Sequence, residues 1–114
     1  MNVKIYHNPR CQKSRLTLQL LQARGIEPEI IEYLKNPPSV AELTALLQML
    51  AIEPRDLMRS KESEYQTLGL ADVTDKQTLI NALVSYPILM ERPIVVANGK
   101  AAIGRPPEAV LAIL

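Results

Sequence analysis

The stretch Val3-Lys4-Ile5-Tyr6-His7-Asn8-Pro9-Arg10-Cys11-Gln12-Lys13-Ser14-Arg15 decides the fold of this chain. Its first residues alternate apolar and polar side chains, as a half-buried strand does, and a leucine-rich helical pattern follows it. The only cysteine in 114 residues therefore lies where a strand gives way to a helix. The unpaired N–H groups at a helix N-terminus favour a thiolate and bind oxyanions. Two arginines, two lysines and a histidine in the same stretch add positive charge, and such surroundings lower a thiol pKa.

Length and composition indicate one globular domain. A chain of 114 residues is long enough for one core and too short for two. No apolar run approaches the roughly 20 residues that span a bilayer, and the N-terminus lacks the apolar segment of a signal peptide. We therefore expect a cytoplasmic protein that does not bind membranes. The net charge of +1 predicts no nucleic-acid partner. A single cysteine excludes an intramolecular disulfide, and we expect no metal site.

The first third of the chain has the pattern of a β-α-β unit. The helix that follows the cysteine is expected to face the core with Leu16, Leu20 and Ala23, and Gly25 is typical of a helix end. Residues 29–33 are predicted to form a second strand, which two prolines close. A strand, a helix and a strand within about 30 residues predict two parallel strands joined by a crossover helix.

The middle of the chain is predicted to be helical, with an insert at about residues 39–85. Ser39-Val40-Ala41-Glu42 has the pattern of a capping box. The helix that it opens is expected to bury one stripe: Val40, Leu43, Leu47 and Leu50. A short helix near 62–67 should end at Gly69. A second capping box is predicted at Thr74-Asp75-Lys76-Gln77, before a helix with this apolar face: Leu79, Ile80, Leu83 and Val84.

The last part of the chain predicts a hairpin and a helix. Two apolar strands, Ile94–Ala97 and Lys100–Ile103, flank Asn98-Gly99, which is typical of a type I′ turn. A final helix is predicted from Glu108 to Leu114, with proline where a first turn accepts it. The order βαβ, helices, ββα is that of a thioredoxin-like fold. We expect an α/β protein with a mixed four-stranded sheet, forming a single domain over residues 1–114.

Several motifs together resemble a known family. They are His-Asn-Pro-Arg-Cys-x-Lys-Ser-Arg beginning at His7, Leu57-Met58-Arg59, Glu91-Arg92-Pro93-Ile94 and Gly104-Arg105-Pro106. Their order and spacing resemble the glutaredoxin-coupled arsenate reductases, the ArsC family. The resemblance covers essentially the whole chain and is close to the short enterobacterial-type members.

The resemblance implies an oxidoreductase of arsenic detoxification. Cys11 would attack arsenate, and His7 and Ser14 match the family pattern around the thiol. Three arginines would hold the oxyanion: Arg59, Arg92 and Arg105. The resemblance further implies glutathione as a co-substrate, glutaredoxin as a protein partner, no bound cofactor, and a cis peptide bond between Arg92 and Pro93.

The residues themselves leave some roles open. His7 either tunes the thiol or packs beside the strand end. We expect the Ser14 hydroxyl to hydrogen-bond the thiolate, although it could be an ordinary first-turn residue. Arg10 and Arg15 are interpreted as solvated charges. Arg15 follows the cysteine too closely for a phosphatase loop, so arginines from elsewhere in the chain must complete an oxyanion site.

Two other functions fit the same fold. A glutathione-dependent thiol or disulfide exchanger would need Cys11 but not all three arginines. A regulator similar to Spx would bind RNA polymerase without catalysis, and such proteins often carry Cys-x-x-Cys. This chain has serine at the second position, Ser14, which counts against the regulator. A lone cysteine in any case needs an external thiol to resolve a disulfide.

Overall fold

The computed structural model describes residues 2–114, which form two compact units. The first unit joins the two ends of the chain, up to Asn36 and from Arg92 to Leu114. The second unit, Pro37–Glu91, contains the helical segment predicted at about 39–85 and extends past it at both ends. None of the helices described is both long and apolar enough to cross a bilayer.

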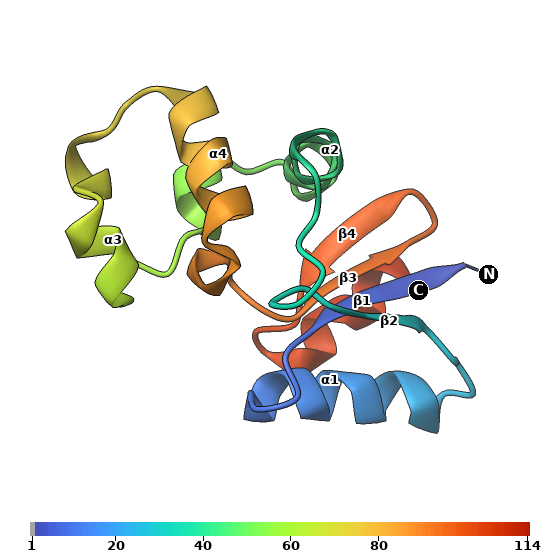
Figure 1. Cartoon of the computed structure of the whole chain (residues 1–114). Helices are drawn as coiled ribbons and strands as arrows, with labels where there is room; N and C mark the ends of the chain where they lie inside the picture. The colour runs from blue at the N-terminus through green and yellow to red at the C-terminus, as the bar shows by residue number, and fades with distance from the viewer. Residues whose placement is uncertain (1) are drawn as a thin grey trace. The chain divides into compact units, whose positions relative to one another are not determined.

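The first unit is built on a mixed four-stranded sheet (Figure 1). Its strands are β1 (Val3–His7), β2 (Glu29–Glu32), β3 (Ile94–Ala97) and β4 (Lys100–Ile103). The strand order is β2-β1-β3-β4, with β2 parallel to β1 and the other two pairs antiparallel. The helix α1 (Gln12–Ala23) makes the crossover from β1 to β2. The predicted order and the mixed sheet are confirmed.

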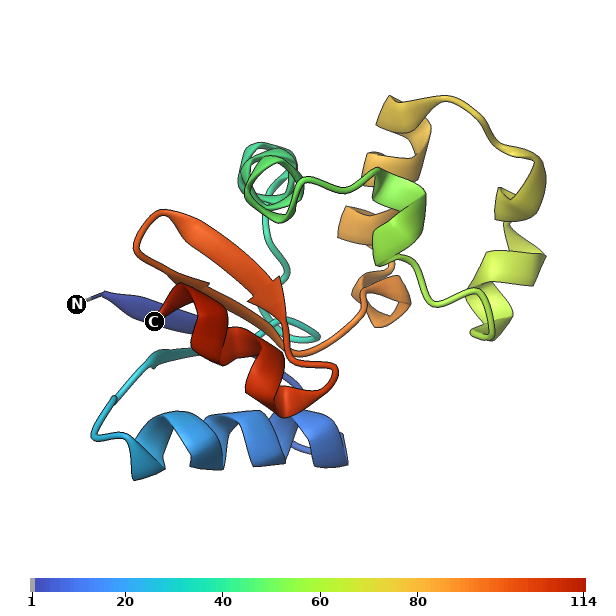
Figure 2. The same cartoon turned by 180° about the vertical axis from the view of Figure 1, so that it is seen from behind.

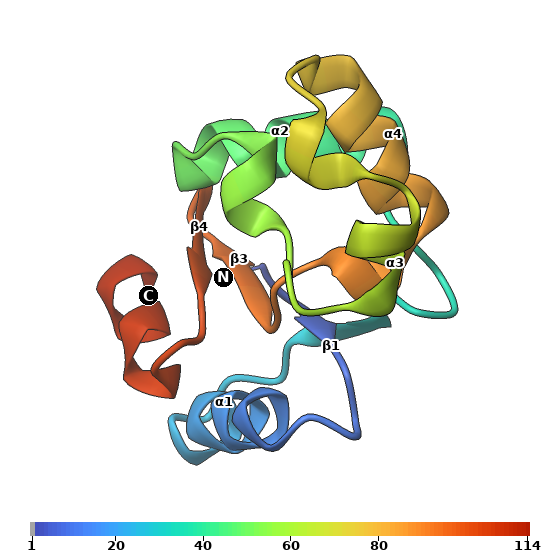
Figure 3. The same cartoon turned by 90° about the vertical axis from the view of Figure 1, so that its left-hand side faces the viewer.

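Two helices cover one face of this sheet. One is α1, and the other is the 3₁₀ helix η4 (Pro107–Ile113), which lies beside α1 (Figures 2 and 3). The final helix predicted from Glu108 to Leu114 is present, as a 3₁₀ helix that begins and ends one residue earlier. The core between helices and sheet is wholly aliphatic: Val3, Ile5, Leu21, Val95, Ala97, Val110 and Ile113.

The inner face of α1 differs from the one predicted. Leu16 is 44% exposed, whereas Ser14 and Thr17 are fully buried beside Leu21. Burying hydroxyls is tolerated because both are hydrogen-bonded: Thr17 Oγ1 donates to the Lys13 carbonyl at 2.8 Å, and Ser14 Oγ has partners described below. The spacing of apolar residues alone therefore predicted the wrong buried face for α1.

The β3–β4 hairpin has the predicted turn. Asn98 and Gly99 have φ values of 56° and 71°, as a type I′ turn requires. The Arg92–Pro93 peptide bond is cis, as the resemblance implied. A second cis bond, Arg105–Pro106, was not predicted. A cis Arg-Pro bond therefore lies on each side of the hairpin, one before β3 and one after β4.

The second unit consists of short helices. They are α2 (Val40–Leu50), η1 (Pro54–Leu57), α3 (Ser63–Thr67), η2 (Leu70–Asp72), α4 (Lys76–Ser85) and η3 (Pro87–Leu89). The capping box at Ser39 and Glu42 is confirmed. The second box was wrong: the N-cap of α4 is Asp75, whose carboxylate accepts from the main-chain N–H of Thr78 at 3.0 Å.

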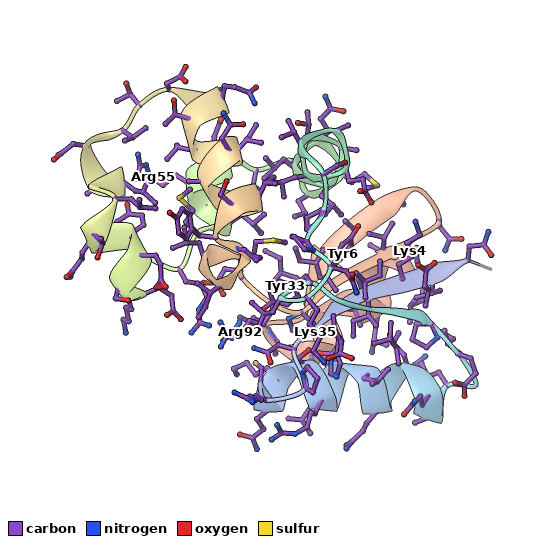
Figure 4. The ribbon with its side chains drawn as sticks, viewed as in Figure 1. Lys4, Tyr6, Tyr33, Lys35, Arg55 and Arg92 are labelled. Carbon is purple, nitrogen blue, oxygen red and sulfur yellow. The ribbon has the colours of Figure 1, made fainter. Side chains whose placement is uncertain are left out.

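One arginine, Arg55, connects the short helices of this unit by side-chain hydrogen bonds. Arg55 donates to the Tyr65 hydroxyl at 2.6 Å, to the Leu70 carbonyl at 3.1 Å and to the Val73 carbonyl. The fork of donors on one guanidinium thus satisfies main-chain groups that the short helices leave unpaired. Arg55 is labelled in Figure 4. It fills a structural role here and is not among the predicted site residues.

Candidate active site

The site begins at the turn between β1 and α1, where Cys11 is the N-cap residue of the helix. Its N–H donates to the Asn8 carbonyl at 3.0 Å, which closes the turn. Arg15 Nη1 donates to the Pro9 carbonyl at 2.9 Å, so the exposed Arg15, interpreted above as a solvated charge, also stabilises the turn. Only 9% of Cys11 is exposed. The fold therefore holds the thiol in a fixed place at the helix N-terminus.

Arginines from the hairpin segments lie beside this thiol. Arg105 Nη2 is 3.9 Å from Cys11 Sγ, and Arg105 Nε donates to the Arg92 carbonyl at 2.9 Å. Arg92, labelled in Figure 4, lies at the start of the segment that leads into β3. Its Nε is buried and has no hydrogen-bond partner among residues 2–114. Two of the three predicted arginines are thus brought to the cysteine.

The surroundings lower the pKa of the Cys11 thiol. Burial has the largest single effect and raises the pKa, because it disfavours the charged thiolate. The main-chain N–H groups of Ser14 and Lys13 and the guanidinium of Arg92 together lower it by more. The sequence predicted this effect from the free main-chain N–H groups of the helix start and from cationic side chains nearby in the sequence. The structure assigns the effect to main-chain donors and to an arginine distant in the sequence.

His7 and Ser14 form a buried pair behind the thiol. His7 Nδ1 and Ser14 Oγ are 2.6 Å apart, and the Asn8 N–H donates to Ser14 Oγ at 3.0 Å. Burial lowers the pKa of His7 below its ordinary value, although the charge of Glu32 opposes this. A neutral His7 adds no positive charge. We expected the Ser14 hydroxyl to bond the thiolate, but among the described residues its partners are His7 and Asn8, and Ser14 acts on the thiol through its N–H.

The third predicted arginine belongs to the second unit. The main-chain N–H of Arg59 donates to the Leu89 carbonyl at 2.7 Å, and Arg59 Nη1 lies 3.3 Å from a Glu62 carboxylate oxygen. Its assignment to the oxyanion site stays a prediction from the family resemblance.

A lowered thiol pKa leads to a testable pH dependence. Only the thiolate is alkylated by iodoacetamide, so the rate should rise with pH through the pKa of folded Cys11 and then level off. We expect a midpoint below the value of about 8.5 for a free cysteine, and a higher midpoint for Arg92→Ala. Both midpoints can be measured by stopping the alkylation reaction at set times over a series of pH values and quantifying the product by mass spectrometry. A wild-type midpoint at or above that of free cysteine would contradict this account.

Gly104, which the sequence marked only as part of a family motif, positions Arg105. Its N–H donates to the Pro93 carbonyl at 2.9 Å, and a Cβ there would lie 2.6 Å from Thr17 Oγ1 and 2.8 Å from Pro93 Cγ. Neither a proline ring nor a buried threonine can move easily to make room for this Cβ. Only glycine therefore allows the end of β4 to approach both α1 and Pro93 so closely.

We accordingly expect Gly104→Ala to destabilise the protein by about 1–3 kcal/mol, the range for overpacked cores, and to displace Arg105. Urea unfolding followed by circular dichroism gives the free energy. Ala109→Ser also adds one atom, at an exposed position, and should change stability by less than about 0.5 kcal/mol. Equal stability of the two variants would show that the close approach is not rigid.

Chemically, the site combines a nucleophile with donors for an anion. A thiolate at a helix N-terminus faces guanidinium groups whose forked donors fit a tetrahedral oxyanion. Within residues 2–114 no three metal-ligating side chains of His, Cys, Asp or Glu gather at one place.

Comparison with known proteins gives a consistent result. Residues 6–113 match the family model described as the ArsC family. The chain is 47% identical to an arsenate reductase of Neisseria meningitidis serogroup A over 98% of this chain and 97% of that protein. It is 58% identical to a protein of Escherichia coli K12 named YfgD, covering 98% and 96% of the two chains. The solved arsenate reductase from Vibrio cholerae superimposes with a TM-score of 0.97 at 52% identity, covering 100% of this chain and 98% of that one.

Proposed function

This chain belongs to the ArsC family, and we propose that it reduces arsenate to arsenite with Cys11 as nucleophile and with glutathione and glutaredoxin as electron donors. The observation that carries the proposal is the meeting of Cys11 Sγ with the guanidinium groups of Arg105 and Arg92 at the N-terminus of α1. The relatives named as arsenate reductases support the choice of substrate.

Binding comes first. Arsenate at neutral pH is a tetrahedral anion, which a thiolate cannot approach unless its charge is compensated. Arg105 and the buried Nε of Arg92 supply donors that stay charged and fix orientation. Arg59 is proposed as a third donor by family resemblance. Holding the developing charge in a partly dry site is usually the largest catalytic effect.

Chemistry then proceeds in balanced steps. The Cys11 thiolate attacks arsenic, and one oxygen leaves as water after protonation, which gives a Cys11–S–As(V) ester. The thiolate of glutathione attacks the Cys11 sulfur, and the electron pair of the S–As bond passes to arsenic. Arsenic(V) is thereby reduced to arsenite, and two thiols are oxidised to one Cys11–glutathione disulfide.

Regeneration needs a second thiol because the chain has no other cysteine. A glutaredoxin thiolate attacks the glutathione sulfur of the mixed disulfide and releases Cys11 as a thiolate, which its surroundings stabilise. A low thiol pKa thus assists twice, because it activates the nucleophile and improves the leaving group.

The test is NADPH consumption in a coupled assay with glutathione, glutaredoxin and glutathione reductase. We expect consumption to depend on arsenate, on this protein and on glutaredoxin, each omission serving as a control. Folded protein that leaves NADPH unconsumed would exclude arsenate reduction. The formation of a mixed disulfide with glutathione under those same conditions would then favour the thiol exchanger.

A further inference from the structure

A pocket of about 280 Å³ lies outside the carboxyl ends of the parallel strands β1 and β2. Its walls come from the β1–α1 turn and from the turn after β2, and the residues that matter are His7, Pro9, Arg10, Glu32, Leu34 and Lys35. In open α/β sheets, ligands bind in the crevice outside the carboxyl ends of parallel strands. The volume is close to the lower end of the range for small-molecule sites, roughly 300–1,000 Å³.

The charges in this pocket are mixed in a distinctive way. Arg10 and Lys35 are exposed cations on opposite walls, and Glu32 is the last residue of β2, paired in register with His7. Glu32 and Lys35 form a loose ion pair of 3.7 Å. Two cations and one carboxylate suit a ligand with two carboxylates and one ammonium group. Leu34, 42% exposed, and Pro9 add apolar surface between the charges.

The lining of the pocket also includes the residues that directly precede the nucleophile. Pro9 and Arg10 line it and directly precede Cys11, and the hydrogen bond from Cys11 N–H to the Asn8 carbonyl keeps this turn tight. The pocket and the nucleophile thus share the β1–α1 turn. Lys35, labelled in Figure 4, follows β2 on the opposite wall.

We propose that this pocket binds glutathione, with Arg10 and Lys35 each pairing with one carboxylate of the tripeptide and Glu32 pairing with its ammonium group. The inference rests on the proposed function, which supplies glutathione as the external thiol. The pocket holds the two ends of the tripeptide, and its central thiol extends over the turn toward the Cys11 sulfur for the reducing step described above.

The first test is direct binding of S-methylglutathione, which cannot react, to the wild-type protein. Amide chemical shifts in two-dimensional NMR should change most at His7, Asn8, Arg10 and residues 32–35. S-methylcysteine, which lacks both ends of the tripeptide, should cause no saturable change. Shifts concentrated elsewhere, for example at residues 92–95, would overturn the proposal. Because this measurement needs no turnover, it can stand or fall independently of arsenate reduction.

Charge variants give the sharper test. Lys35→Glu should weaken binding about tenfold, since an attraction becomes a repulsion. The matched control Lys100→Glu makes the same change at an exposed position on β4 and should stay within about twofold. Glu32→Gln distinguishes specific recognition of the ammonium group of glutathione from a general attraction of anions. The proposal requires weaker binding, whereas tighter binding of the negatively charged tripeptide would contradict it.

Kinetics then separate this proposal from the function itself. In the coupled assay, Lys35→Glu should raise the KM for glutathione and leave the KM for arsenate unchanged. Arsenate turnover with normal glutathione kinetics in this variant would overturn the pocket and leave the reductase standing. Specific binding of S-methylglutathione without any arsenate turnover would support the pocket and exclude the reductase.

Discussion

We expect Cys11→Ser to abolish arsenate-dependent NADPH consumption, with a fall of at least about 10³-fold. Two physical reasons act together. A serine hydroxyl is not ionised near neutral pH, so the nucleophile is lost. In addition, the two electrons that reduce arsenic come from forming a disulfide, and an oxygen atom cannot take the place of the Cys11 sulfur in that bond. No rearrangement of the site can compensate for the second loss.

The same variant should keep its fold. Cys11 is the N-cap of α1 with extended backbone angles, φ −95° and ψ 122°. Serine is among the residues preferred there, because its oxygen accepts the first free N–H groups of the helix. Thermal unfolding and circular dichroism should therefore match the wild type. Turnover by a folded Cys11→Ser protein would show that another group attacks arsenate.

The sequence predicted the fold well where local chemistry is decisive. The Asn98-Gly99 turn and the Ser39 capping box depend on particular residues at fixed spacing, and both are present. The α1 stripe depends on tertiary partners. Ser14 and Thr17 are buried because each hydroxyl is hydrogen-bonded, and a pattern of apolar residues cannot show that.

The candidate site shows the same division. Cys11 could be placed at a helix start from the sequence, and the structure confirms that position. The main-chain N–H groups that lower its pKa could also be predicted, but the effect of Arg92 could not, since the pairing of β1 with β3 brings Arg92 near the thiol. Gly104 could be placed in a family motif, but the reason for glycine there could not be predicted, because it lies in the distances to Thr17 and Pro93.

Removing either hairpin arginine should lower kcat/KM for arsenate by about 10²–10³-fold, the usual cost of losing one donor to a developing oxyanion. Arg105 Nη2 is 3.9 Å from Cys11 Sγ, and its Nε is anchored on the Arg92 carbonyl, so Arg105→Ala removes a donor held in place. Lysine at either position keeps the charge but loses the fork and should rescue only part of the activity. Steady-state kinetics at varied arsenate measure these effects.

The two arginines should differ in a second measurement. Arg92 lowers the pKa of Cys11, so Arg92→Ala should shift the alkylation midpoint to higher pH as well as impair turnover. Arg105→Ala should impair turnover with a smaller shift, because Arg92 and not Arg105 is the guanidinium that lowers the thiol pKa. Arg24→Ala, at the exposed end of α1, is the matched control and should change neither. If both hairpin variants kept normal turnover, the oxyanion would have to bind elsewhere, and the juxtaposition of Arg105 with the thiol would have only a structural meaning.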